Sequence, residues 1–238
     1  DHLNGTRRVF TYWGGDASGT NYAKSNSILM DGPKTVTANW KTEYLVTFAQ
    51  TKLDTTANGT VVTVNGDAKT FSHLPYTTWV DSGNSISYSY SDPVSSGVKG
   101  KRFKLVDVTG PVSPITVTGP VTVTGNYKIQ YQVTVKQSGC GTTVTATIDG
   151  DSHDLPVDFW FDEGSEHIIS VPSTVNQYEF TRWHDDKTTF SRTIVVTSPA
   201  EYTAYYARAL SSSSIPPLSL SSPTISLGKT ITLSGSIV

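Results

Sequence analysis

Cysteine and methionine are almost absent from the sequence, which holds one of each among 238 residues. An intrachain disulfide needs two thiols, so the lone Cys140 excludes one, and it excludes a cysteine-based zinc site as well. Cys140 lies in the segment Ser-Gly-Cys-Gly-Thr, which is typical of a turn that requires a small residue. A free reactive thiol or an intermolecular disulfide is the alternative interpretation.

Charge is scarce too, and its two signs are balanced. Charged residues make up 16% of the chain, and 18 Lys and Arg against 20 Asp and Glu leave a net charge of −2. Nucleic acids and anionic membranes bind clusters of positive charge. The composition therefore argues against both as partners.

Long apolar runs are missing as well. No stretch approaches the roughly 18 consecutive apolar residues of a transmembrane helix. The chain opens on Asp1 without the pattern of a signal peptide, as a mature, processed or excised chain would. Because the surface is rich in Thr and Ser and poor in oxidisable residues, we expect an extracellular protein at the cell surface.

What the sequence does contain is a period-two alternation of apolar and polar residues, as in Ile86 and Tyr88 among serines. The dipeptides Asn65-Gly66 and Asp149-Gly150 tolerate positive φ, which the tight turns of β-hairpins require. No ten residues keep the spacing of an amphipathic helix. We therefore predict an all-β protein of small antiparallel sandwich or barrel-like modules, with little or no helix.

The sequence also repeats itself. Three motifs recur at a spacing of roughly 80 to 87 residues or about twice that: 35–48 returns as 122–135, 74–85 as 155–166, and 9–13 as 179–183 and more weakly as 104–108. Tandem copies of one small unit indicate an extended scaffold whose neighbouring units stabilise one another.

This spacing divides the chain into five parts. They are the back half of a β repeat (1–43), two full repeats (44–127 and 128–208), a Ser- and Pro-rich linker (209–217) and terminal strands (218–238). The last part is too short for a core of its own. It is either an incomplete immunoglobulin-like module or a set of strands donated to a neighbouring copy. Its candidate assembly residues alternate with polar ones: Leu218, Leu220, Ile225, Leu227, Ile231 and Leu233.

Recurring aromatic residues allow a prediction of burial. Residues that return at one place of a structural unit usually fill its core, so we expect five tryptophans there: Trp13, Trp40, Trp79, Trp160 and Trp183. Four tyrosines are expected to show one face to solvent: Tyr88, Tyr90, Tyr202 and Tyr205.

Two segments are similar to sites of chemistry. Asp81-Ser82-Gly83 resembles the aspartic protease motif, in which two carboxylates share a proton. Its repeat copy, Asp162-Glu163-Gly164, lacks the Ser or Thr, so hairpin turns explain both better. Asp149, Asp151 and Asp154 are weak candidates for a calcium site, because the first repeat breaks this cluster. We expect no catalytic residues and no cofactor.

Two sequons, Asn4-Gly5-Thr6 and Asn58-Gly59-Thr60, each combine a turn dipeptide with a glycan acceptor pattern. They make Asn4 and Asn58 candidates for N-glycosylation in an exported protein. Sequons also arise by chance in a Thr-rich chain, so their occupancy stays open.

Three stretches carry a resemblance to a known family: GTRRVFTYWGGDASG, ILMDGPKTVTANWKTEY and YEFTRWHDDKTTFSRTIVVTSPAEYTAYY. They are similar to divergent internalin B-type repeats, the tandem β modules of large prokaryotic and especially archaeal surface proteins. The middle copy departs from the pattern, with Val108 in place of Trp. The tail resembles the opening strands of a bacterial-type immunoglobulin-like domain. The resemblance implies a stalk, adhesin, surface-layer or filament component.

We therefore expect a non-catalytic cell-surface scaffold that assembles with copies of itself or contacts other surface proteins. Filament or surface-layer formation by exchange of the C-terminal strands is the sharper hypothesis. An adhesin or carbohydrate-binding module is the first alternative, and exposed aromatic residues would favour it. An accessory region of a surface protease is the second alternative.

Overall fold

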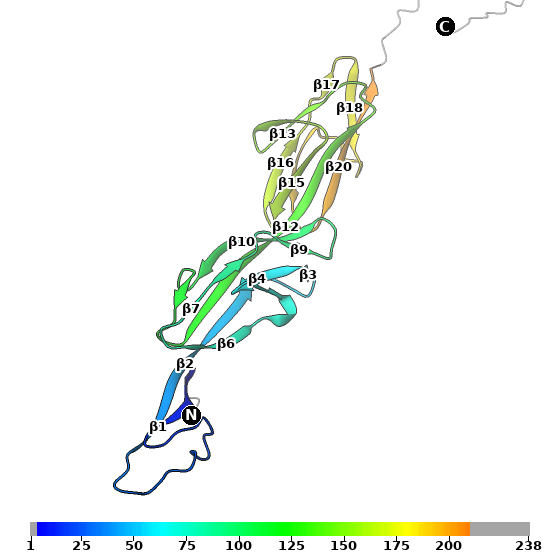
Figure 1. Cartoon of the computed structure of the whole chain (residues 1–238). Coiled ribbons are helices and arrows are strands. Elements are labelled where there is room, and N and C mark those ends of the chain that lie inside the picture. The colour runs from blue at the N-terminus through cyan, green and yellow to red at the C-terminus, as the bar shows by residue number, and fades with distance from the viewer. Residues whose placement is uncertain (1–3, 210–238) are drawn as a thin grey trace, which may run out of the picture.

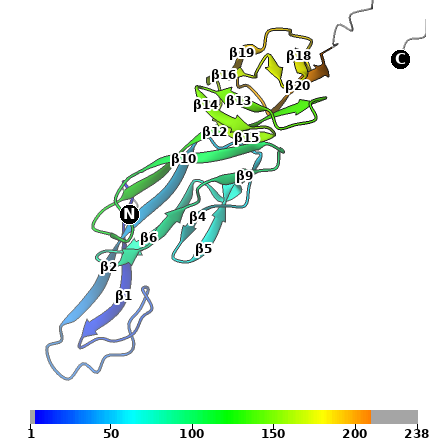
Figure 2. The same cartoon turned by 90° about the horizontal axis from the view of Figure 1, so that it is seen from above.

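The computed structural model describes residues 4–209, which form an elongated rod of β-strands (Figures 1 and 2). The predicted all-β fold is confirmed, and one 3₁₀ turn, η1 (Phe71–His73), interrupts the strands of this part of the chain. The strands are β1 (Thr6–Gly15), β2 (Val36–Thr51), β3 (Ala57–Asn58), β4 (Thr60–Val64), β5 (Asp67–Thr70), β6 (Tyr76–Asp81), β7 (Ser85–Ile86), β8 (Tyr88–Tyr90), β9 (Val94–Ser96), β10 (Lys101–Thr109), β11 (Ile115–Thr116), β12 (Val121–Ser138), β13 (Thr145–Ile148), β14 (Asp151–Asp154), β15 (Val157–Asp162), β16 (Glu166–Ser170), β17 (Thr174–Val175), β18 (Tyr178–Trp183), β19 (Ser191–Val195) and β20 (Ala200–Arg208).

Three strands, β2, β12 and β20, form the spine of the rod (Figure 1). The end of β2 lies parallel to the start of β12, with Val46 opposite Val121. The end of β12 lies parallel to the start of β20, with Val133 opposite Ala200. These two pairs correct the prediction of purely antiparallel modules. They are parallel because all three strands run the same way along the rod.

β12 shows how one strand serves two units. Its buried apolar side chains fall on odd-numbered positions, as the two-residue period of a strand dictates, and the even-numbered Gln130 is buried at the junction. Val123 and Tyr127 belong to the first hydrophobic core, whereas Val133 and Val135 belong to the second. The repeat boundaries suggested by the sequence, after residues 43 and 127, therefore lie inside β2 and β12.

Each complete unit closes its core with smaller sheets. These are β5-β4-β8 and the pair β7-β11 in the first unit, and β14-β13-β16-β19 in the second. Phe48 and Phe103 are fully buried in the first core, and Trp183 and Ile169 in the second. Burial of one such side chain contributes about 1.5–3 kcal/mol, so these cores hold the layers together.

The two hairpin turns form as predicted. In Asn65-Gly66 the φ angles are 48° and 89°, and in Asp149-Gly150 they are 52° and 97°. Both pairs lie in the left-handed region that a type I′ turn requires. The side chains of Asn65 and Asp149 then accept hydrogen bonds from the backbone N–H groups of Ser87 and Ile168, each at 2.8 Å. Each turn is thereby tied to the next strand of its sheet.

A single hairpin stands at the amino end of the described chain, and we call it the N-terminal unit. It consists of the hairpin of β1 and β2 and the loop between them, and within residues 4–209 no second sheet is paired with it. The linker predicted for 209–217 lies, apart from Ala209, outside the described residues. The terminal strands predicted for 218–238 lie outside them too, with Leu218, Leu220, Ile225, Leu227, Ile231 and Leu233.

The prediction of five core tryptophans is wrong for all except Trp183. Trp40 is 45% exposed, and the others are partly buried: Trp13, Trp79 and Trp160. The prediction of a solvent-facing Tyr90 is wrong as well, since this residue belongs to the first core. Residues that recur in the sequence occupy equivalent positions of the units. Such a position is buried only where a second layer of the unit covers it.

Candidate interaction surfaces

A cluster of aromatic rings lies open at the amino end of the rod. The ring centre of Phe10 is 5.3 Å from that of Trp13 and 5.5 Å from that of Trp40, and Tyr22 lies 5.6 Å from Trp40. Tyr22 is 66% exposed and Trp40 is 45% exposed. We call these four residues the N-terminal aromatic face. Tilted and edge-on packing holds the rings together, although no layer covers them.

The strand register shows which residues of the second complete unit correspond to this face. Phe10 lies opposite Trp40 just as Phe180 lies opposite Tyr206, and a register shift follows at the next residue in both cases. The side chain of Trp13 donates to a loop carbonyl at 2.9 Å, as does that of Trp183. The hairpin of β1 and β2 therefore has the same strand register as β18 and β20 of the second complete unit.

Two positions of this face are covered in the complete units. Tyr127 and Tyr206, which stand in the place of Trp40, are 3% and 5% exposed, and Trp183, in the place of Trp13, is fully buried. Tyr22 follows the carbonyl that accepts from Trp13, and the residue in that place of the second complete unit, Phe190, is 51% exposed. At Trp40 and Trp13 the N-terminal aromatic face thus lacks the layer that covers these counterparts.

A nearby loop segment also lacks the partner that its counterparts have. Residues 28–33, Ile-Leu-Met-Asp-Gly-Pro, repeat the pattern of 115–120 and 194–199. In the complete units this segment forms β11 or β19, which pair with β7 and β16. Residues 28–30 form no strand, and Met30 is 74% exposed. The described part of the N-terminal unit offers no strand that could pair with them, which accounts for the difference.

A charged network marks the junction between the first two units. The guanidinium of Arg7 lies 4.4 Å from the ring centre of Trp79 and forms an ion pair with Glu43. Nζ of Lys41 lies 2.8 Å from carboxylate oxygens of both Glu43 and Asp81. The network therefore ties β1, β2 and β6 together.

The next junction repeats this network at equivalent positions. Arg102 lies 4.3 Å from the ring centre of Trp160, and its Nε donates to Oε1 of Gln130 at 2.9 Å. Asp162 accepts from Lys128 at 2.6 Å and from Gln130 at 2.8 Å. A planar guanidinium on an indole face makes a cation–π contact, which strengthens where water is excluded.

These partners set the ionisation of the junction carboxylates. The hydrogen bond from Lys41 lowers the pKa of Glu43, which is itself buried. Partial burial raises the pKa of Asp162, but the bonds from Lys128 and Gln130 outweigh it and leave the pKa below its ordinary value. Asp81 and Asp162, the two aspartates of the protease-like motifs, are thus each held by a lysine at a separate junction.

At the carboxyl end of the described residues, the positions of the charged network hold other side chains. The position of Arg7 and Arg102 is occupied by Gln177, whose backbone carbonyl accepts from Ala209 N–H at 2.7 Å. Ala207 stands where the junction lysines stand. Within residues 4–209, the end of β20 therefore lacks the arginine and lysine of the other two junctions.

A chain of hydrogen bonds in the second unit was not foreseen from the sequence. Oγ of Ser165 lies 2.8 Å from Nε2 of His167, whose Nδ1 lies 2.6 Å from Oδ2 of Asp149. The imidazole stacks on Phe161 with ring centres 3.5 Å apart. The corresponding residue of the first unit is the buried Ile86. The polar chain is therefore particular to the second unit.

The order Ser, His, Asp is that of a hydrolase triad, but the serine hydroxyl has another partner. The hydroxyl of Ser165 donates to the backbone oxygen of Asp162 at 2.7 Å. The hydrogen bond from His167 lowers the pKa of Asp149. A serine nucleophile instead directs its proton to the imidazole.

The weak metal candidates are separated by their own partners. Asp149 binds His167, and Asp154 accepts from the hydroxyl of Thr145 at 2.6 Å, whereas Asp151 is exposed at the start of β14. Among residues 4–209 no cluster of His, Cys, Asp or Glu is arranged to hold a metal ion.

The glycosylation candidates lie at the surface. Asn4 precedes β1 and is exposed, and Asn58 is the exposed last residue of β3. Both therefore leave room for a glycan. The free thiol of Cys140 is buried instead, as expected for a small residue packed at a turn.

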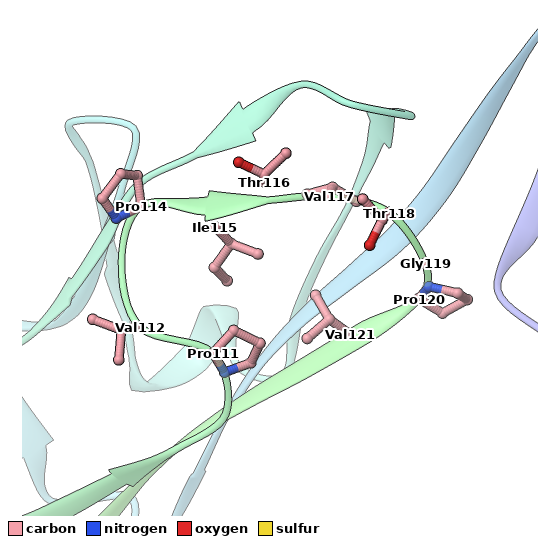
Figure 3. A pocket seen from close by; sticks show the side chains of 10 residues that line it. All are labelled: Pro111, Val112, Pro114, Ile115, Thr116, Val117, Thr118, Gly119, Pro120 and Val121. Atoms are coloured by element: carbon pink, nitrogen blue, oxygen red, sulfur yellow. The ribbon is translucent and has the colours of Figure 1, made fainter.

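The loop between β10 and β12 encloses an open pocket of about 330 Å³ (Figure 3). Three prolines shape its wall, Pro111, Pro114 and Pro120, and the side chains of Ile115 and Val121 lie inside the loop between them. No charged or titratable side chain lines it. Its polar side chains are the hydroxyls of Thr116 and Thr118, so it offers hydrogen bonds but no charge to a ligand.

No protein-family model matches the chain, and no curated protein matches it. Among solved structures the chain is similar to the major pilin protein T-13 of Streptococcus pyogenes, at 10% identity and a TM-score of 0.24. That match covers 70% of this chain and 97% of the pilin. Within residues 4–209 no helix is long and apolar enough to cross a membrane.

Proposed function

We propose that the chain is a non-catalytic extracellular structural protein whose copies join end to end into a filament or surface layer. The observation that carries the proposal is the N-terminal aromatic face. Trp40 occupies a place that is buried in both complete units, yet it is 45% exposed, beside the exposed Tyr22. An isolated core face of this kind favours association, because covering it removes apolar surface from water.

The architecture of the rod supports a mechanical role. The spine strands run through both cores, and the charged networks of Arg7 and Arg102 repeat at the two junctions. An end-to-end contact between copies is heterologous, and such a contact generates an open filament. The exposed Asn4 and Asn58 are consistent with a glycosylated surface protein. The proposal also includes a relation of this chain to archaeal internalin B-type repeats.

Sedimentation over a concentration series, followed by electron microscopy, tests this function. We expect the full chain to form unbranched filaments or sheets at micromolar concentration, and removal of residues 218–238 to leave monomers. A full chain that stays monomeric at every concentration would contradict the proposal.

Carbohydrate binding is the second candidate, because exposed rings such as those of Trp40 and Tyr22 can stack on sugars. A glycan array separates the two functions. A scaffold gives no selective signal, whereas a carbohydrate reader gives one that Trp40→Ala abolishes.

A further inference from the structure

We propose that the N-terminal aromatic face receives residues 218–238 of a second copy as the covering strands that its unit lacks. This inference rests on the proposed self-assembly and adds the acceptor surface and the donor segment. It follows from three observations: what covers the same face in the complete units, what the donor segment contains, and how far that segment reaches.

The complete units show what the face accepts. Ile86 of β7 lies opposite Ile115 of β11, and both are buried in the first core. Tyr88 and Tyr90 continue the same apolar row, separated by serine. In the N-terminal unit Ile28 stands in the place of Ile115 without an opposite strand. The face therefore calls for extended segments with an apolar residue at every second position.

Residues 218–238 have this pattern. They carry apolar pairs at a spacing of two, separated by Ser or Thr: Leu218 and Leu220, Ile225 and Leu227, Ile231 and Leu233. Residues 230–236, Thr-Ile-Thr-Leu-Ser-Gly-Ser, match residues 145–151, Thr-Ala-Thr-Ile-Asp-Gly-Asp, which form β13 and its turn. Ala146 and Ile148 of β13 pack in the same core as Trp183, so Ile231 and Leu233 have the corresponding places.

The length of the rod makes a second copy the source of these strands. The path along the spine runs from Val36 to Val46, which lies beside Val121, then to Val133, which lies beside Ala200, and ends at Arg208. This path covers about 30 residues, or roughly 100 Å at about 3.3 Å per residue. The about 30 residues after Arg208 reach at most about 100 Å when fully extended. A chain stretched to its own amino end would have no residues left to pair there.

Mixing two full-length variants tests the inference. Met30→Asp places a charge on the acceptor and leaves the donor intact. Ile231→Asp with Leu233→Asp breaks the donor and leaves the acceptor intact. Because Met30 is exposed in the single chain, its substitution leaves the fold unchanged. Val112→Asp, at an 85% exposed position away from both ends, is the matched control. Thermal unfolding verifies that each variant is folded.

At concentrations where the wild type assembles, we expect each variant alone to sediment as a monomer, with a self-association affinity at least tenfold weaker. The control should assemble like the wild type. An equal mixture should form one-to-one dimers and nothing larger, since it has one working acceptor and one working donor per pair. If the wild type assembles and the variants do too, or the mixture stays monomeric, the inference is overturned while self-assembly stands. A wild type that never assembles overturns the proposed function itself.

Discussion

At the scale of the residue, two neighbouring aspartates show how the burial of a partner decides what an ion pair contributes. Asp185 makes two bonds of 2.8 Å with Arg192, whose side chain is 7% exposed and lies over Tyr202. Asp186 binds Arg182 with its own side chain 85% exposed. The bonds from Arg192 lower the pKa of Asp185 to about 2.

Asp185→Asn should lower the free energy of unfolding by about 1–2 kcal/mol at pH 7, because it leaves a buried guanidinium without its carboxylate. The pKa of Asp185 is lower in the folded chain, so its contribution is complete above about pH 4 and is lost as the pH falls toward 2. Denaturant unfolding between pH 2 and 7 should therefore show a shallower acid loss in the variant. Asp186→Asn is the control, with an expected change below about 0.5 kcal/mol. Equal effects of the two substitutions would contradict this explanation.

Tyr90 is a second residue whose burial has a consequence for pH. Its hydroxyl donates to the backbone oxygens of Ala49 at 2.7 Å and Val123 at 3.0 Å, which joins β2 to β12. Burial raises its pKa to about 12. The folded chain thus holds the phenolic proton more tightly than the unfolded chain, in which tyrosine titrates near pH 10.

We expect Tyr90→Phe to cost about 1–2 kcal/mol at pH 7, because two carbonyls lose their donor. Stability should fall between pH 10 and 12 in the wild type and fall less steeply in the variant, since Tyr206, whose pKa is also about 12, still titrates. Denaturant unfolding at pH 7, 10 and 11.5 measures both effects. An alkaline slope that is the same in both proteins would show that Tyr90 does not titrate on unfolding.

At the scale of the element, the contact of Arg102 with Trp160 holds β10 against β15. A double-mutant cycle with Arg102→Ala and Trp160→Leu should give a coupling free energy of about 0.5–1 kcal/mol. Arg182 over Tyr205, at 4.6 Å with the arginine 46% exposed, is the control pair and should couple by less. A coupling near zero at the junction would mean that the stacked geometry contributes nothing to its strength.

Much of the local structure could be predicted from the sequence, because hairpins are specified by neighbouring residues. Asn65-Gly66 and Asp149-Gly150 form the expected turns for that reason. The parallel pairing of β2 with β12 could not be predicted, since apolar and polar residues alternate in the same way in parallel and antiparallel strands. The exposure of Trp40 depends on a covering layer, which no local pattern encodes.

The site residues also divide into those that the sequence indicates and those that only the fold brings together. The repeated network of Arg7 and Arg102 left a signal in the sequence, because each arginine stands two residues before a copy of the motif that begins at residues 9 and 104. The bond between His167 and Asp149 left none. His167 and Asp149 are distant in the sequence, and only the register of β13 and β16 brings them into contact.

At the scale of the whole molecule, the rod has one open core face and a terminal segment with the pattern of covering strands. A filament of such rods should repeat axially at roughly 100 Å, the length of the strand path. Electron micrographs of assembled protein measure this spacing. A lateral lattice with a much shorter repeat would contradict an end-to-end contact.

The most direct measurement of strand completion is hydrogen exchange at residues 28–30, which form no strand in the single chain. If a second copy pairs with them, their amides should exchange slowly in the assembled wild type and rapidly in the variant with Ile231→Asp and Leu233→Asp. Equally rapid exchange in both proteins, with the wild type assembled, would contradict the claim that a neighbouring copy completes the N-terminal unit.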